Sequence, residues 1–108
     1  MRVVLKDSAR KDLLKIGKGD GKAARRLRTF LHTLETTPDP RRLPNAKKLK
    51  GIPNGWRFRV GEYRIETLIL KTKGGWDFAE IAEIAEILKD EEFLEVHKIA
   101  ARQNAYKK

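Results

Sequence analysis

The chain has 108 residues and a formal net charge of +10 at pH 7, with 25 lysine and arginine residues against 15 acidic ones. This length predicts a single domain over residues 1–108 with a small core. The excess of positive charge indicates a polyanionic partner, nucleic acid above all. The absence of cysteine excludes disulfides and thiolate metal sites, and two histidines are too few for an ordinary zinc centre, so we expect no cofactor and no metal.

The distribution of apolar residues argues against a membrane protein. No apolar run reaches the roughly 18 residues that a membrane span requires. The chain also turns polar directly after Leu5, before a signal peptide could form. We therefore expect a cytoplasmic protein with no membrane partner.

The first third of the chain predicts a strand followed by two helices. Residues 3–5 (Val-Val-Leu) fit a short strand, and Asp7 or Ser8 can cap a helix whose apolar residues recur on one face. Residues 17–21, three of which are glycine, end that helix. A second amphipathic helix is predicted from about residue 22 to residue 36, and the prolines that follow stop it.

Residues 47–64 form the most informative stretch of the sequence. A turn at residues 53–55 (Pro-Asn-Gly) leads into a strand in which apolar and cationic side chains alternate, and a tight turn then starts a second strand at Tyr63. The alternation hides one face and exposes the other, which suits a polyanion. The residues predicted for the hidden face are Trp56, Phe58 and Val60. The basic residues are Arg57, Arg59 and Arg64 in the strands, with Lys47, Lys48 and Lys50 before them.

The stretch between the Tyr63 strand and a last strand at residues 93–99 has no single interpretation. Residues 65–70 continue the strand pattern, but the unit Ala-Glu-Ile then recurs three times over residues 79–87, a period that fits neither a strand nor a helix. Residues 1–73 hold twenty cationic and seven acidic side chains, whereas residues 74–92 hold one lysine and seven acids. This acidic segment is predicted to be an extra helix or hairpin that either stays off the basic surface or packs across it.

The order of elements and motifs resembles the RelE/ParE toxin superfamily of bacterial and archaeal toxin–antitoxin systems. The matching motifs are residues 8–13 (Ser-Ala-Arg-Lys-Asp-Leu), 48–51 (Lys-Leu-Lys-Gly), 56–64 (Trp-Arg-Phe-Arg-Val-Gly-Glu-Tyr-Arg), 96–99 (Val-His-Lys-Ile), Arg102 and 105–107 (Ala-Tyr-Lys). The resemblance implies an α+β fold, in which a first strand and two helices pack with a small, mainly antiparallel twisted sheet. The chain departs from the pattern at about residues 66–84, which look inserted because residues 85–96 resemble the family's complete hairpin. It departs again at Ala100-Ala101, where many relatives have a basic pair.

The resemblance also implies a reaction. RelE-type toxins cleave messenger RNA in the ribosome by attack of a ribose 2′-oxygen on the adjacent phosphate. The attack produces a pentavalent phosphorane, and arginine suits the stabilisation of its negative charge. Relatives often carry lysine at positions where this chain has arginine, which is a poor base. The implied catalytic residues are Arg57, Arg59, Arg64, Arg102 and Tyr106, and the implied RNA-binding residues are Lys47, Lys48 and Lys50. The implied partners are messenger RNA, the ribosome and a cognate antitoxin.

Each assignment has a structural alternative. Arg64 could instead pair with Glu62 or Glu66, and Tyr106 could only pack the tail. Arg57 and Arg59 could form an ordinary solvated strand face. His97 shares the strand parity of Glu95 and could act as an acid or base, although a structural role is the simpler interpretation.

Two other functions compete with RNA cleavage. A ParE-like protein of the same fold would poison DNA gyrase. A catalytically inactive RNA- or partner-binding module would fit the missing lysines, the Ala100-Ala101 pair and the insert.

Overall fold

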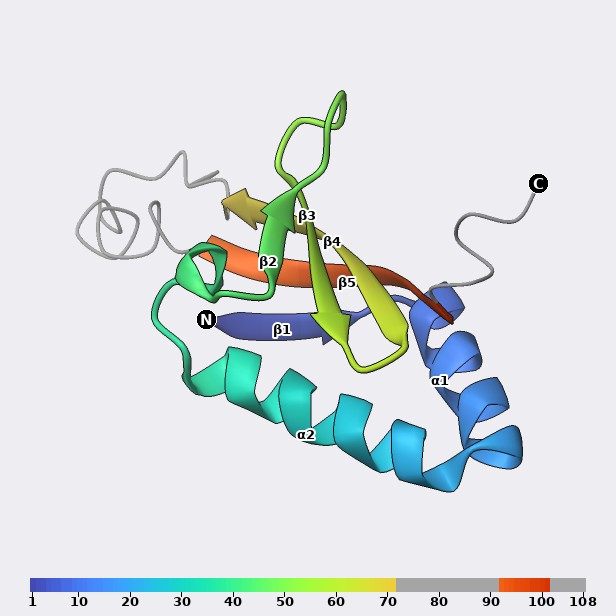
Figure 1. Cartoon of the computed structure of the whole chain (residues 1–108). Helices are drawn as coiled ribbons and strands as arrows, with labels where there is room; N and C mark the ends of the chain where they lie inside the picture. The colour runs from blue at the N-terminus through green and yellow to red at the C-terminus, as the bar shows by residue number, and fades with distance from the viewer. Residues whose placement is uncertain (72–91, 102–108) are drawn as a thin grey trace, which may run out of the picture.

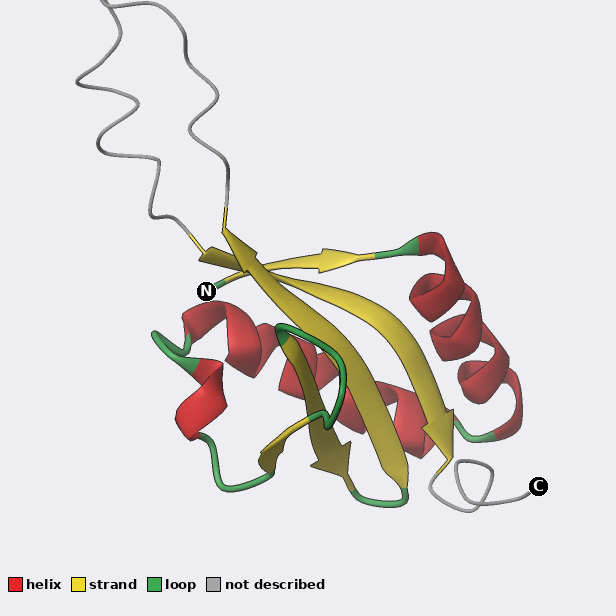
Figure 2. Cartoon of the chain, turned by 90° about the horizontal axis from the view of Figure 1, so that it is seen from above, coloured by secondary structure: helices red, strands yellow, loops and turns green. Residues whose placement is uncertain are grey.

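The computed structural model describes residues 1–71 and 92–101, which form two helices and one five-stranded sheet (Figure 1). In chain order the elements are β1 (Arg2–Leu5), α1 (Asp7–Gly19), α2 (Gly21–Thr36), the 3-10 helix η1 (Pro40–Arg42), β2 (Ala46–Lys48), β3 (Gly55–Val60), β4 (Tyr63–Lys71) and β5 (Glu92–Ala101). The strand order is β1-β5-β4-β3-β2, and only the β1–β5 pair is parallel. Both helices lie on the same side of the sheet (Figure 2). The predicted α+β class and element order are confirmed.

The core lies between the helices and the covered side of the sheet. The rings of Phe30 in α2 and Phe58 in β3 lie 5.7 Å apart, centroid to centroid. Phe58 and Val60 are buried in the core and Trp56 packs against this core, as the alternation predicts. Burial of each large apolar side chain contributes about 1.5–3 kcal/mol. The buried apolar residues are Ala9, Leu27, Leu31, Leu34, Phe58, Val60, Ile65, Ile69, Leu94, Val96 and Ile99.

The two helices meet at a single residue. α1 continues through Gly17 and ends at Gly19, so the prediction that residues 17–21 break the helix is wrong in its extent. Asp20, at φ −149° and ψ 83°, separates the helices, and its carboxylate accepts a hydrogen bond from the backbone N–H of Ala23 at 3.0 Å. Among the described residues, no helix has the length and apolarity of a membrane span.

Side chains near the amino-terminal end of α1 form hydrogen bonds with the backbone of β5. The predicted cap at Asp7 or Ser8 is wrong, because Lys6 is the N-cap residue and no side chain caps the helix. Ser8 Oγ instead donates a hydrogen bond to the carbonyl oxygen of His97 at 2.7 Å. Asp12 accepts one from the backbone N–H of Ile99 at 3.0 Å. β1 pairs only with the first part of β5, so α1 supplies the partners that the rest of this edge needs.

The start of the predicted insert is wrong. Residues 66–71 belong to β4, which pairs with β5 as far as Lys71 and Glu92. The physical reason is that β5, ten residues long, takes β4 as its antiparallel partner along the whole length of β4. The remainder of the predicted insert and the Ala-Glu-Ile repeat lie outside the described residues.

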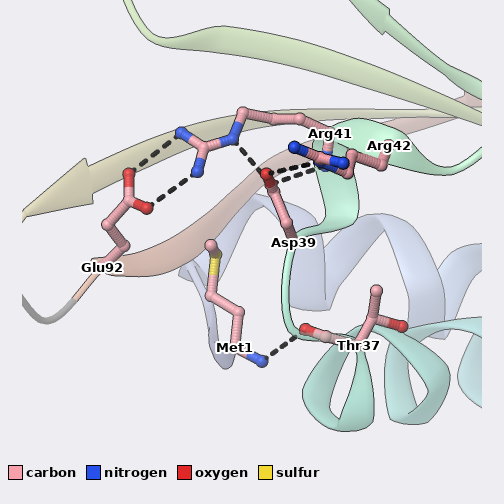
Figure 3. Close-up of polar contacts among 6 residues, drawn as sticks. All are labelled: Met1, Thr37, Asp39, Arg41, Arg42 and Glu92. Atoms are coloured by element: carbon pink, nitrogen blue, oxygen red, sulfur yellow. Dashed lines mark hydrogen bonds and ion pairs between the residues drawn. The ribbon is translucent and has the colours of Figure 1, made fainter.

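An arginine in η1 anchors the beginning of β5 (Figure 3). Arg41 donates hydrogen bonds to both carboxylate oxygens of Glu92, at 2.8 and 3.0 Å, and its Nε donates to Asp39 at 2.7 Å. These bonds hold the pKa of Asp39 below its usual range and raise the pKa of Arg41. The amino group of Met1 donates nearby to the carbonyl oxygen of Thr37 at 2.8 Å. A turn at residues 43–45 then connects η1 to β2.

Candidate nucleic-acid interface on the sheet

The side of the sheet turned away from both helices is the candidate site, and we call it the open face (Figure 2). Its side chains alternate along each strand with those buried in the core. The strand register then decides which of them are neighbours. The charged and titratable residues of the open face are Lys47 from β2, Arg57 and Arg59 from β3, Arg64 and Glu66 from β4, and Glu95, His97 and Lys98 from β5.

Three of the predicted arginines lie together on this face. Arg59 is directly opposite Arg64, and Arg57 lies one step along β3 on the same side, between Lys47 and Glu66. Neighbouring strands are about 4.8 Å apart, so one phosphate group could contact several of these side chains.

Arg64 makes an ion pair with Glu66, one of the two acids that the sequence offered as its partner. Arg64 Nε lies 3.3 Å from Glu66 Oε2, and the two side chains are 21% and 30% exposed. The Nε atom is buried and donates no hydrogen bond to a described residue, so this contact is an ion pair without hydrogen-bond geometry. The pair orients the guanidinium group on the open face, while its role towards a phosphate stays a prediction.

The three predicted RNA-binding lysines do not lie together. Lys47 pairs with Arg57 and shares the open face. Lys48 pairs with Trp56 and lies on the opposite side of the sheet, where its Nζ is 5.7 Å from the centre of the Trp56 indole. Lys50 is exposed in the loop between β2 and β3. The open face therefore contains one of the three lysines.

A β-bulge places His97 on the open face. The register between β4 and β5 shifts between Glu66 and Thr67, which leaves His97 without a partner in β4. The residues on either side of the bulge, Val96 and Ile99, both point into the core. His97 lies between them on the other side, and bulges of this kind redirect side chains next to functional sites.

A glutamate holds the imidazole of His97. Its Nε2 lies 3.0 Å from Oε1 of Glu95, two residues earlier on the same side of β5. The Glu95 side chain is 18% exposed and that of His97 is 38% exposed. A largely buried carboxylate therefore fixes an imidazole whose other edge can meet solvent or a ligand.

A small pocket lies beside this pair, beneath the loop that joins β2 and β3. Its volume is about 170 Å³, and it is lined by Ile52, Glu66, Thr67, Leu68 and His97. Ile52 packs closely against Gly55, where a Cβ atom would lie 2.8 Å from Ile52 Cγ2. The pocket thus combines an apolar lid with an imidazole and a carboxylate.

Two of the predicted catalytic residues, Arg102 and Tyr106, lie outside the described residues. The predicted site residues include no acid, whereas the structure places Glu66 and Glu95 on the open face. Glu66 is two residues from Arg64, and Glu95 is two residues from His97. This spacing places each pair on the same side of a strand, so it could have identified both acids from the sequence. Within residues 1–71 and 92–101, no cluster of three or more histidine, aspartate or glutamate side chains could hold a metal ion.

The chain is similar to known toxins of toxin–antitoxin systems. Residues 3–92 match the family model described as the ParE toxin of the type II toxin–antitoxin system parDE. A Methanocaldococcus jannaschii protein named as a RelE1 toxin is 26% identical over 83 residues, which cover 77% of this chain and 72% of that protein.

Two solved structures share the fold. One is the YoeB/ParE toxin from Agrobacterium tumefaciens, with a TM-score of 0.62 and 18% identity, over 94% of this chain and 98% of that chain. The other is a chain of the RelB–RelE antitoxin–toxin complex from Methanococcus jannaschii, with a TM-score of 0.59 and 19% identity, over 95% of this chain and 94% of that chain. At these identities the likeness concerns the fold alone.

Proposed function

The chain belongs to the ParE toxin family of type II toxin–antitoxin systems, in agreement with its resemblance to the RelE/ParE superfamily, and from the residues of its open face we propose that it cleaves messenger RNA on the ribosome. The observation that supports this reaction best is the register that groups Arg57, Arg59 and Arg64 on the open face. Guanidinium groups suit a reacting phosphate, because each can bind two of its oxygens and keeps its charge.

The proposed reaction is attack of a ribose 2′-oxygen on the adjacent phosphate, with release of a 5′-hydroxyl group. Negative charge grows on the phosphate oxygens in the transition state, and preorganised cationic donors stabilise it there. Arg102 and Tyr106 are proposed to complete the site. Lys47 and Lys50 are proposed to contact ribosomal RNA phosphates through salt-sensitive interactions. Lys48 contributes less to this surface because it lies beside Trp56 on the other side of the sheet.

Primer extension on a translated message tests the proposal. Arg64→Ala should slow cleavage by about 10²-fold or more, the usual effect of removing one transition-state donor. The matched control is Arg25→Ala, which removes the same charge from the exposed surface of α2, on the other side of the sheet, and should cleave at the wild-type rate. A message left intact by the wild-type protein would reject the proposal. Equal rates for wild type and Arg64→Ala would remove Arg64 from the site.

Inhibition of DNA gyrase is the alternative function, and one observation favours it: the matching family model is that of ParE. In that case DNA supercoiling by purified gyrase should stall in the presence of the protein while messages stay intact. Salt-sensitive RNA binding with neither activity would instead indicate an inactive binding module.

We also propose that an antitoxin is the protein partner, as the RelB–RelE complex suggests. A groove of about 440 Å³ between α1 and α2 has an apolar floor that includes Leu14, which is 63% exposed. Basic side chains surround it, namely Arg10, Lys18, Arg25 and Arg28. This arrangement fits an amphipathic helix with acidic flanks. Leu14→Glu should weaken the toxin–antitoxin complex in a titration, and unchanged affinity would reject this groove as the interface.

A further inference from the structure

We propose that His97 donates the proton to the leaving 5′-oxygen during RNA cleavage, and that Glu95 positions its imidazole. The inference rests on the function proposed above and supplies a group that the arginines lack. Arginine remains protonated in proteins and cannot act as a proton donor in a catalytic cycle. An imidazole takes up and releases a proton near neutral pH and is the commonest general acid in enzymes.

The position of His97 follows from the bulge in β5. The extra residue turns both His97 and Lys98 away from the core, onto the open face. The charged groups around the imidazole are Glu95 and Lys98 from β5 and Glu66 from β4, whereas the loop above contributes the apolar side chain of Ile52. His97 is thus surrounded by both carboxylate and ammonium groups at the edge of a pocket.

The contact with Glu95 determines which edge of the imidazole can react. It engages Nε2 at 3.0 Å, so Nδ1 is the atom available to a substrate. A carboxylate bound to one ring nitrogen fixes the orientation of the ring, as in other carboxylate–histidine pairs. Glu95 is therefore a positioning residue, and His97 is the group that contacts the substrate.

The sheet register places the imidazole within reach of the arginine cluster. Glu66 lies opposite Arg57 in β3 and beside the bulge in β5. The backbones of β3 and β5 are therefore about 10 Å apart, two strand spacings. A phosphate held by Arg57 above the sheet would direct one ester oxygen towards His97. The pocket of about 170 Å³ beneath Ile52 then suits the sugar ring of the leaving nucleotide.

The chemical step balances without a cofactor. The 2′-hydroxyl gives its proton to a water molecule, and the 2′-oxygen forms a bond to phosphorus. The bond between phosphorus and the 5′-oxygen breaks, and its electron pair stays on that oxygen. The imidazolium of His97 gives its Nδ1 proton to the 5′-oxygen, so the products are a 2′,3′-cyclic phosphate, a 5′-hydroxyl group, a neutral imidazole and a hydronium ion.

A message with sulfur in place of the 5′-oxygen at the cleavage site distinguishes this role from a structural one, because a thiolate leaves without protonation. On the ordinary message, His97→Ala should be about 10²-fold slower than wild type, a typical contribution of general acid catalysis. On the 5′-sulfur message the two proteins should cleave at similar rates. Arg64→Ala is the matched control and should stay slow on both messages, because phosphate stabilisation is needed in either case.

Further variants separate the proposal from a folding defect. His97→Gln retains a side chain that can hydrogen-bond to Glu95 and should show the same pattern as His97→Ala. Added imidazole should partly restore cleavage of the ordinary message by His97→Ala. Equal slowing of the His97 variants on both messages, or no slowing at all, would overturn the role of His97 while RNA cleavage itself stands. A wild-type protein that cleaves neither message would overturn the proposed function and this inference together.

Discussion

Arg41 shows how one side chain can fix two distant parts of this chain. It reaches from η1 to Glu92, 51 residues later, while its Nε holds Asp39 two residues earlier (Figure 3). The side chains of Arg41 and Glu92 are 31% and 25% exposed, so solvent screens the pair only in part. β5 is thereby anchored at its first residue, and β5 is the strand that carries His97.

Arg41→Ala should lower the free energy of unfolding by about 1 kcal/mol, since solvent screening limits the contribution of a partly exposed ion pair. The next residue provides the control: Arg42 is 88% exposed and lies 3.7 Å from Asp39. Arg42→Ala should therefore change stability by less than about 0.5 kcal/mol. Urea unfolding of the three proteins measures the difference. Equal midpoints for both variants would contradict this account.

The contribution of Arg41 should also depend on pH. Its hydrogen bond lowers the pKa of Asp39 in the folded protein. A lowered carboxyl pKa stabilises the fold fully above the unfolded value, about 3.9, and this contribution is lost as the pH falls through the lower folded value. The stability difference between wild type and Arg41→Ala should therefore be constant near neutral pH and shrink below about pH 4.

At the scale of elements, glycines have opposite roles in α1 and in the loop after β2. Gly17 lies inside α1, and a Cβ atom there would meet only Ala24 Cβ, at an ordinary 3.6 Å. Gly51 has φ +80°, and a Cβ atom there would meet no atom within 4 Å, so only its backbone conformation requires glycine. Gly17 therefore lowers the stability of α1, whereas Gly51 provides the positive φ that the turn requires.

Gly17→Ala should therefore stabilise the protein by about 0.5–1 kcal/mol, because alanine is the better helix former and loses less backbone entropy on folding. Gly51→Ala should destabilise it by about 1 kcal/mol through strain at positive φ. Thermal unfolding of both variants provides the comparison. A shift of the same sign in both would mean that the backbone at one of these positions differs from that described.

At the scale of the whole molecule, charge is divided between the two sides of the sheet. The open face groups arginines by strand register, whereas the arginines of α2 line its exposed surface on the other side (Figure 2). Net charge affects attraction to any polyanion, but only cations close to its phosphates release counterions on binding. An experiment can therefore separate the effect of where a cation lies from the effect of the total charge on RNA binding.

The logarithm of the binding constant for a single-stranded RNA oligonucleotide should fall linearly with the logarithm of the salt concentration. Arg57→Ala should reduce the magnitude of that slope by about 0.7, the value for one phosphate contact to a single strand. Arg28→Ala removes the same charge from the exposed surface of α2 and should leave the slope unchanged. Identical slopes for the two variants would show that binding depends on net charge and not on the open face.

The sequence determined the parts of this protein that depend on local patterns. The period of apolar residues predicted both helices, and alternation in β3 predicted that Phe58 is buried while Arg57 and Arg59 lie on the other side. These patterns survive folding because a helix or strand fixes the direction of each side chain relative to its neighbours. The family resemblance added the element order and the toxin family, both of which are confirmed.

Only the tertiary structure decided what depends on register. Lys47 and Lys48 are adjacent in sequence, but pairing with β3 places them on opposite sides of the sheet. The length of β4 became clear only from its pairing with β5, because residues 85–96 alone resemble a complete hairpin. The bulge at His97 follows from a shift between two strands that no local pattern encodes. A one-residue change in register moves side chains to the opposite face of a sheet. The sequence therefore determined which cationic residues lie in each strand. The pairing of the strands decided which of these residues share a face with the imidazole.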